Sequence, residues 1–172
     1  MPTVSDPAER FCRWLEGNAG FTEVRIVRKL TGGNANVTSL VDTASGPLVL
    51  RHPPTNTVSD LAGAGISREF RFISVIAGNA PVAEPILYCD DVEIFGAPFS
   101  LTRFVPGTAI TDTLPPAYSN SIATIDAVGI ALIDALAKVH AITPVPEGLG
   151  DVKKARNFVA RQIERWRAVR LA

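Results

Sequence analysis

The chain has 172 residues, enough for one domain or for one domain and part of another. Hydrophobic residues make up 47% and charged residues 20%, which excludes an intrinsically disordered chain. Seventeen basic and seventeen acidic residues cancel, which disfavours nucleic acid as the main partner. We find no apolar run of membrane-spanning length, no secretory signal and only two cysteines. The sequence therefore predicts a cytoplasmic protein that does not act at a membrane and has neither a disulfide framework nor a zinc site.

Asp6 and Pro7 predict the start of a helix, because aspartate caps helices and proline fits their first turn. Gly17 is the expected end of this helix. Residues 21–30 then have β character, and two short strands at 37–41 and 48–51 follow. Turn-forming residues join those two strands, so they predict a hairpin. The expected apolar face of the helix consists of Phe11, Trp14 and Leu15.

Residues 55–65 are polar and contain glycine, which predicts a loop. The spacing of Ile66, Phe70 and Ile73 then predicts a helix over 66–77. Further short strands are expected at 86–89, 92–95 and 99–105.

Residues 110–120 are rich in Thr, Pro and Ser and mark the expected boundary between a mixed region and a helical region. Helices are predicted over 122–141 and 151–171. Seven basic residues accompany the single acidic residue Glu164 between positions 152 and 172. This basic segment is a solvated helix face, a surface for phosphate or acidic ligands, or a surface that meets further protein. The order of elements predicts an α+β fold rather than a doubly wound α/β fold.

Three features of the first half suit a phosphate ligand. Residues 30–36, Leu-Thr-Gly-Gly-Asn-Ala-Asn, form a turn in which adjacent glycines allow close approach and backbone N–H groups can bind phosphate; the alternative is a plain hairpin turn. Arg51 ends the hairpin, and Glu69 on the following helix could pair with it, although each could instead be a solvated surface residue. Together these features have the layout of a protein-kinase small lobe, in which a lysine–glutamate pair positions the nucleotide phosphates.

Four further segments carry a resemblance to a known family: Val49-Leu50-Arg51-His52-Pro53-Pro54, Arg68-Glu69-Phe70-Arg71, Pro85-Ile86-Leu87-Tyr88-Cys89-Asp90 and Gly96-Ala97-Pro98-Phe99. In this order and spacing, these segments resemble the aminoglycoside phosphotransferase/choline kinase-like superfamily. The similarity is to the branch that stands alone or is fused ahead of an acyl-CoA dehydrogenase domain. It extends from about residue 21 to residue 166 and implies a protein-kinase-like N-lobe over 1–107, followed by the first helices of a helical C-lobe over 108–172.

This resemblance implies a nucleotide-binding site with ATP and Mg²⁺ as the expected cofactors. Arg51 stands where kinases carry the phosphate-binding lysine, and Glu69 stands where they carry its helix partner. His140, at the end of a matching helix, is expected to be structural. The residues that match the nucleotide-covering loop are Gly32, Gly33, Asn34 and Asn36. The hinge residues, whose backbone would bind adenine, are Thr102, Arg103, Phe104 and Val105.

The His-Gly-Asp catalytic loop of that family and its later metal-binding aspartate have no match here, since neither His52 nor His140 is followed by Gly-Asp. We therefore expect no catalytic residue, no metal ligand and no phosphotransfer from these 172 residues by themselves. One function is the nucleotide-binding part of an ATP-dependent kinase that phosphorylates a hydroxyl of a small molecule, with a hydroxyacyl-CoA-like acceptor. The alternative is a non-catalytic module that binds a nucleotide or a partner. Apolar residues of 122–141 would also allow homo-oligomer formation.

Overall fold

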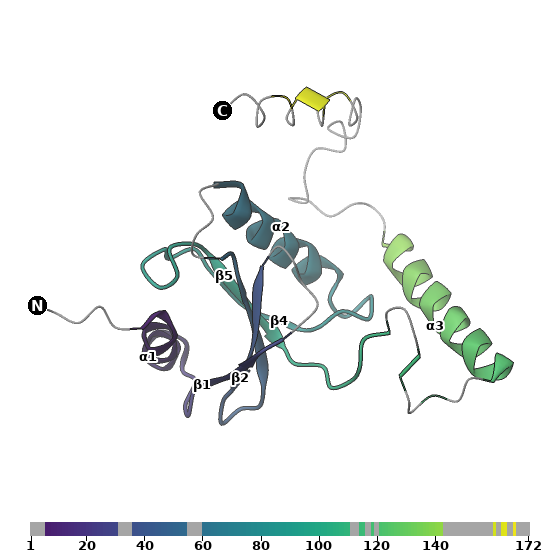
Figure 1. Cartoon of the computed structure of the whole chain (residues 1–172), viewed down its shortest axis with the longest axis horizontal. Helices are drawn as coiled ribbons and strands as arrows, with labels where there is room; N and C mark the ends of the chain where they lie inside the picture. The colour runs from purple at the N-terminus through teal and green to yellow at the C-terminus, as the bar shows by residue number, and fades with distance from the viewer. Residues whose placement is uncertain are drawn as a thin grey trace, which may run out of the picture.

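The computed structural model describes residues 6–30, 36–54, 60–110, 114–115, 118, 121–142, 160, 163–164 and 167. Within these residues, a five-stranded antiparallel sheet is combined with three helices (Figure 1). The strand order across the sheet is β1-β2-β3-β5-β4. The predicted α+β fold, with a kinase-like antiparallel sheet, is therefore confirmed. In chain order the elements are α1 (Pro7–Ala19), β1 (Arg25–Lys29), β2 (Val37–Asp42), β3 (Leu48–His52), α2 (Asp60–Ile76), β4 (Pro85–Cys89), β5 (Phe99–Arg103) and α3 (Ile122–His140).

Helix α1 begins where the sequence predicts but ends later. The Asp6 carboxylate accepts a backbone hydrogen bond of 3.2 Å from the first turn, and Pro7 lies in that turn. The predicted end at Gly17 is wrong, because the helix continues through this residue to Ala19. It ends at Gly20, whose φ of 71° lies in the left-handed region that glycine adopts without strain.

Helix α2 begins within the segment that the sequence assigns to a loop. The helix includes residues 60–65, although Gly63 and Gly65 lower its intrinsic propensity. A Cβ atom at Gly63 would lie 3.0 Å from the Cδ atom of Pro98, so glycine allows the helix to approach that loop closely. Tertiary packing therefore outweighs local propensity at this end of the helix.

The strand predicted over 92–95 is wrong, because these residues form a turn. The Asp91 carboxylate accepts a 2.9 Å hydrogen bond from the Glu93 N–H, and the Val92 carbonyl accepts one of 2.7 Å from the Gly96 N–H. Ile94 and Phe95 of this turn are buried in the core, whereas Val92 is exposed. The hydrophobicity of Ile94 and Phe95 therefore reflects burial rather than strand formation.

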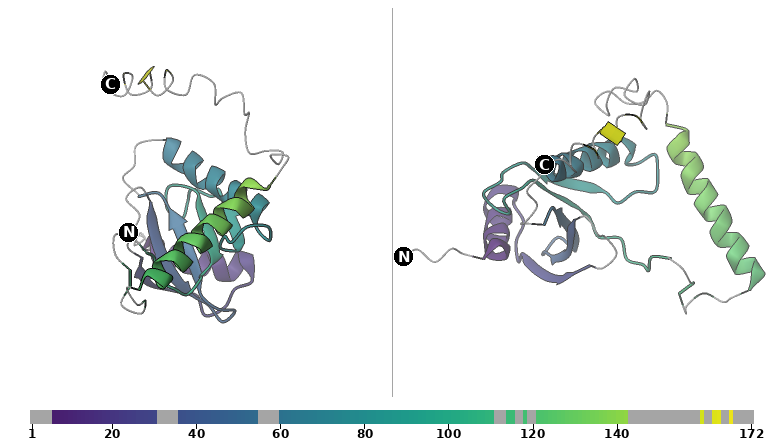
Figure 2. Two further views of the ribbon diagram at one scale, coloured as in Figure 1. Left: turned by 90° about the vertical axis from the view of Figure 1, so that its right-hand side faces the viewer. Right: turned by 45° about the horizontal axis from the view of Figure 1, so that its top comes forward.

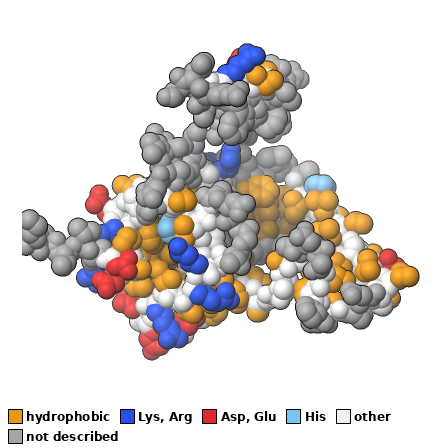
Figure 3. Space-filling model, viewed as in Figure 1, with side chains coloured by type: hydrophobic (Ala, Val, Ile, Leu, Met, Phe, Trp, Pro, Cys, Tyr) orange, Lys and Arg blue, Asp and Glu red, His pale blue; other side chains and the backbone are white. Residues whose placement is uncertain are grey.

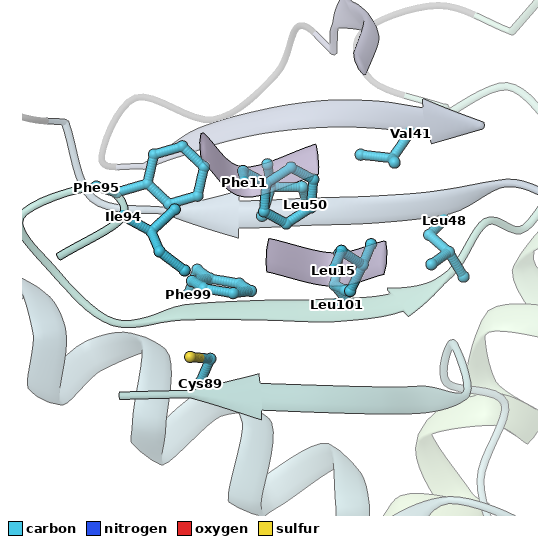
Figure 4. Packing of buried hydrophobic residues seen from close by; sticks show 10 residues of the cluster. All are labelled: Phe11, Leu15, Val41, Leu48, Leu50, Cys89, Ile94, Phe95, Phe99 and Leu101. Carbon is cyan, nitrogen blue, oxygen red and sulfur yellow. The ribbon is translucent and has the colours of Figure 1, made fainter. Parts of the chain in front are cut away.

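The core lies between α1 and one face of the sheet (Figure 4). Phe11 and Leu15 of α1 are fully buried. The ring of Phe99 packs edge-on against Phe11 and Trp14, with centroid distances of 5.5 and 5.4 Å. These contacts make α1 part of the sheet's hydrophobic core. The sheet contributes the fully buried side chains of Val41, Leu48, Leu50, Phe99 and Leu101.

Helix α2 lies on the opposite face of the sheet. Leu48 and Leu50 on β3 pack toward α1, so strand alternation directs Val49 and Arg51 to the other face. On that face α2 contacts β3, β4 and β5, and its Glu69 pairs with Arg51. The sheet is thus covered by one helix on each face.

Helix α3 has no buried residue, although it carries few charges. Its start is capped by Ser121, whose hydroxyl accepts a 3.2 Å hydrogen bond from the Thr124 N–H. Figure 2 shows this helix standing away from the sheet, and Figure 3 shows hydrophobic side chains gathered over it. Its exposed large side chains, with their exposed fractions, are Ile122 (78%), Ile125 (53%), Ile130 (60%), Leu132 (70%), Ile133 (66%) and Leu136 (51%).

Two sequence predictions concern residues beyond α3 or the division of the chain. The basic helix predicted over 151–171 lies largely outside the described residues; Ala160, Ile163, Glu164 and Arg167 are helical. The division into 1–107 and 108–172 stays a prediction. In the part of the chain that the structure describes, no helix is both long and apolar enough to cross a membrane.

Candidate functional site

Arg51 occupies the centre of the sheet on the face that α2 covers. Strand β3 lies between β2 and β5, and Arg51 is opposite Thr38 on one side and Ser100 on the other. The neighbouring residues Leu50 and His52 are buried, so the alternation of the strand projects the arginine toward α2. The sequence predicts Arg51 at the end of the strand that completes the hairpin, and the structure places it one residue before the end of β3, an interior strand of the sheet.

The predicted partner of Arg51 lies within ion-pair distance. The Nη1 atom of Arg51 is 3.0 Å from Oε1 of Glu69, which confirms that the two residues pair. Both side chains are half-buried, with 38% and 42% of their surfaces exposed. An ion pair this exposed contributes only about 0–1 kcal/mol to stability. Stabilisation alone is therefore a weak explanation for a charged pair at the centre of the sheet.

The guanidinium of Arg51 also has unused hydrogen-bonding capacity. Its Nε atom is buried and has no hydrogen-bond partner among the described groups. Buried polar atoms are normally satisfied, and an arginine fork matches the oxygens of phosphate and carboxylate. Glu69 holds one nitrogen of the fork while another remains without an acceptor. This arrangement suits an anionic ligand on the α2 face of the sheet.

The described residues on either side of the glycine-containing turn lie one strand away from Arg51. Gly32, Gly33 and Asn34 lie outside the described residues, so their predicted contacts stay predictions. The two ends of the turn are described: the Leu30 N–H donates to the Thr38 carbonyl at 2.8 Å. Thr38 is directly opposite Arg51 in the β2–β3 register. Leu30 and Thr38, which bracket the turn, thus lie one strand away from the arginine. Asn36 is half-buried and directly precedes β2.

The predicted hinge lies at the opposite end of the same strands. Arg103 is opposite Leu48, at the start of β3, whereas the turn adjoins His52 at its end. Four residues of strand separate these positions, which corresponds to roughly 13 Å at about 3.3 Å per residue. A nucleotide carries its base and its phosphates at opposite ends, so this spacing is compatible with one that lies along β3.

The four residues of the predicted hinge differ in which groups they could present to a ligand. The side chain of Thr102 lies on the same face as Arg51, because strand alternation places Ser100 and Thr102 together. The side chain of Arg103 lies on the other face, and its N–H, like that of Phe104, is already bonded within the protein. Val105 is 63% exposed. The strand predicted over 99–105 ends at Arg103, so Phe104 and Val105 belong to the linker.

Sequence reasoning missed the role of His52, which follows Arg51. Its ring stacks on Phe95 at a centroid distance of 4.1 Å and an interplanar angle of 6°, and its Nδ1 atom lies 2.7 Å from the Pro53 carbonyl oxygen. Burial lowers the pKa of His52, and Lys29 contributes in the same direction, whereas the Pro53 contact opposes them. The residue is therefore a neutral core histidine. His140, by contrast, is exposed at the end of α3.

Within the described residues, no group of three or more His, Cys, Asp or Glu side chains could hold a metal ion. The described part of the chain thus provides charge and hydrogen bonds for an anion but does not fit a metal centre by itself.

Comparison with known proteins agrees with this geometry. Residues 26–172 match the sequence model of the phosphotransferase enzyme family. The chain belongs to this family. The match begins in β1 and includes Arg51, Glu69 and the hinge, so the family resemblance predicted from the sequence is confirmed.

Two relatives of this chain are much longer proteins. "Acyl-CoA dehydrogenase family member 10" of Mus musculus is 28% identical over 167 residues, which cover 96% of this chain and 15% of that protein. "Acyl-CoA dehydrogenase family member 11" of Homo sapiens is 26% identical over 141 residues, which cover 81% of this chain and 18% of that protein. The phosphotransferase-family chain thus spans less than a fifth of these relatives.

A solved structure supports the fold. The crystal structure of a Ralstonia eutropha protein assigned as an aminoglycoside phosphotransferase superimposes with a TM-score of 0.65 at 26% sequence identity. The superposition covers 93% of this chain and 46% of that one. The phosphotransferase-family chain therefore corresponds to about half of this solved structure.

Proposed function

We propose that the chain forms the nucleotide-binding part of an ATP-dependent phosphotransferase that phosphorylates a hydroxyl group of a small molecule. The observation that carries this proposal is the Arg51–Glu69 pair of 3.0 Å, whose arginine has a buried Nε atom that finds no hydrogen-bond partner among the described residues. Membership of the phosphotransferase enzyme family supports the reaction class. In the reaction, the terminal phosphoryl group of ATP moves to the acceptor oxygen, ADP leaves, and the hydroxyl proton passes to a base.

The residues of this chain would bind and orient ATP. Arg51 would bind phosphate oxygens through its fork, and Glu69 would hold that fork in place, so that less ordering entropy is lost on binding. The turn that contains Gly32 and Gly33 would cover the phosphates with backbone N–H groups. The linker after Arg103 would receive the base. Phosphoryl transfer depends largely on such positioning.

Magnesium normally accompanies ATP in this family, where it neutralises the phosphate charge. The described residues do not form a metal site. We therefore assign them no metal-dependent step and restrict their role to the nucleotide.

The acceptor that we propose is a hydroxyacyl-CoA-like molecule. This finer proposal rests on the relatives, which are named as acyl-CoA dehydrogenase family members. An enzyme that phosphorylates a hydroxyl of an acyl-CoA would act on the same class of compound that those names describe. A comparison of hydroxyacyl-CoA with an aminoglycoside as acceptors would test this, and turnover of only the aminoglycoside would contradict it.

A second candidate function is a module that binds a partner without catalysis. The exposed apolar side chains of α3, such as Leu132 at 70% exposure, favour contact with further protein. No His-Gly-Asp sequence occurs in the 172 residues, so the expected absence of phosphotransfer by this chain stays a prediction.

Calorimetric titration of ATP against the wild type and Arg51→Ala tests the main proposal. Arg51→Ala should weaken binding by about 1–3 kcal/mol, the range for a hydrogen bond to a charged group. The matched control is Arg68→Ala, which removes an exposed arginine from the helix that carries Glu69 and should leave the affinity unchanged. Equal affinities of the wild type and Arg51→Ala would remove Arg51 from the site.

A further inference from the structure

Arg103 is the last residue of β5, and the backbone around it is held from both sides. Its N–H donates to the Glu84 carbonyl at 2.8 Å, next to β4. The following N–H, that of Phe104, donates to the Pro47 carbonyl at 3.1 Å, next to β3. The end of the strand is therefore fixed between its two neighbouring segments.

The side chain of Arg103 repeats this two-sided contact. Its Nη1 atom donates to the Ser45 carbonyl at 3.2 Å, in the turn between β2 and β3. Its Nε atom lies 3.5 Å from the Glu84 carboxylate, just before β4. The planar fork of arginine can make two such contacts in different directions, whereas a lysine ammonium has no fixed fork. One side chain thus connects the turn, the segment before β4 and the end of β5.

These contacts add little to stability, because the Glu84 side chain is 66% exposed and exposed ion pairs contribute little. The contacts of the Arg103 side chain instead hold the end of β5, from which the linker begins. Val105 is exposed, and within the described residues no acceptor takes its N–H. The N–H groups of Arg103 and Phe104 are already bonded, so among the described residues Val105 presents the first backbone N–H without an acceptor after the sheet. Pro106, which follows it, has no N–H.

We propose that Arg103 is a positioning residue for the nucleoside end of the bound nucleotide, an inference that rests on the nucleotide-binding function proposed above. Its side chain fixes the junction between β5 and the linker, and the junction places the Val105 N–H where the base is received. Arg103 acts through the backbone and does not touch the ligand. Arg51, which lies toward the other end of the paired strands β3 and β5, binds the phosphates.

Calorimetric titrations of the full chain with two probes distinguish the role of Arg103 at the nucleoside end from the role of Arg51 at the phosphate end. The probes are ATP and inorganic tripolyphosphate, each with the same concentration of MgCl₂. Arg103→Ala should weaken ATP binding about fivefold to tenfold, as for the loss of one or two hydrogen bonds, and leave tripolyphosphate binding unchanged. Arg51→Ala should weaken the binding of both probes. Arg103→Lys should recover only part of the ATP affinity, because lysine cannot make both contacts.

Two further variants serve as controls. Arg25→Ala, on β1, removes the surface ion pair of 2.9 Å between Arg25 and Asp42 and should change the affinity for neither probe. Glu84→Gln removes the carboxylate but keeps the hydrogen bond from the Arg103 N–H to the carbonyl of residue 84. It should lower only the ATP affinity, and by less than Arg103→Ala does. If Arg103→Ala does not fold, Glu84→Gln takes its place in the test.

The outcomes distinguish this inference from the function on which it rests. If the wild type binds both probes and Arg103→Ala loses affinity for both equally, or for neither, the positioning role of Arg103 is overturned and the nucleotide site remains. If the wild type binds neither probe, the proposed nucleotide function itself is overturned, and this inference with it.

Discussion

The sheet with its two helices and helix α3 both contain large apolar side chains but bury them very differently. Leu50 and Leu101 in the sheet are fully buried, whereas Leu132 in α3 is 70% exposed. An apolar residue stabilises a fold only when another part of the molecule removes it from water. In the first region, helix α1 and the sheet supply the side chains that cover one another. The described residues provide no such cover for α3.

The largest expected effect comes from the same substitution made in each region. Leu101→Ala should lower the free energy of unfolding by about 2–5 kcal/mol, since it removes a fully buried side chain and leaves a cavity. Leu132→Ala should change it by less than about 0.5 kcal/mol, as for an exposed position. Urea unfolding followed by tryptophan fluorescence measures both values. Equal losses would show that α3 is covered in solution.

The second prediction concerns what the exposed face of α3 does. We expect the wild type to self-associate, because exposed apolar patches of this kind usually find a partner. The double variant Leu132→Glu with Leu136→Glu should weaken association by at least about tenfold, or 1.4 kcal/mol. Sedimentation velocity over a range of concentrations measures this. A wild type that stays monomeric at high concentration would contradict the prediction.

The third prediction uses His52, whose pKa is lowered by burial in the sheet core. The unfolded chain takes up a proton near pH 6.5 and the folded chain only at lower pH, so the contribution of His52 is complete above about pH 6.5 and falls as the pH decreases. The loss is at most about 1.4 kcal/mol per pH unit. His52→Phe keeps an aromatic ring on Phe95 and should flatten the pH dependence of the unfolding free energy between pH 7 and 5. Parallel profiles for the two proteins would refute this role.

The smallest expected effect is at the start of α1. Asp6→Ala should destabilise the protein by about 1 kcal/mol, because it removes the carboxylate that accepts the 3.2 Å hydrogen bond. Asp6→Asn is the matched control and should retain most of the stability. Thermal unfolding by circular dichroism measures both. A null effect of Asp6→Ala would show that this cap does not contribute to the stability of α1.

The fold could be predicted where local sequence and packing agree. The hairpin of β2 and β3 and the pairing of Arg51 with Glu69 both follow from residue order. The errors arose where contacts distant in sequence matter: the helical Gly63 lies close to Pro98, and the turn that contains Phe95 packs that side chain into the core rather than extending as a strand. No local pattern contains those contacts.

The candidate site was predictable only in part for the same reason. Arg51 and Glu69 lie on elements with clear periodicity, so their meeting could be anticipated. Arg103 was expected to contribute to the hinge, but its side chain contacts Ser45 and Glu84, which come from two different connections. The stacking of His52 on Phe95 likewise joins segments far apart in sequence. Such contacts depend on the order of strands in the sheet.

That strand order also governs how the protein can fold. The central pair joins β3 to β5, so that Leu50 lies opposite Leu101, while α2 and β4 are formed by the residues between them. Strands β1 to β3 can form early as a meander, but the edge of β3 that pairs with β5 stays unpaired until the chain has been synthesised through Arg103. Pairing across such a long loop is slow, and an unpaired strand edge is prone to aggregation in the meantime. The newly made chain therefore passes through a stage in which the centre of its future sheet is an exposed edge.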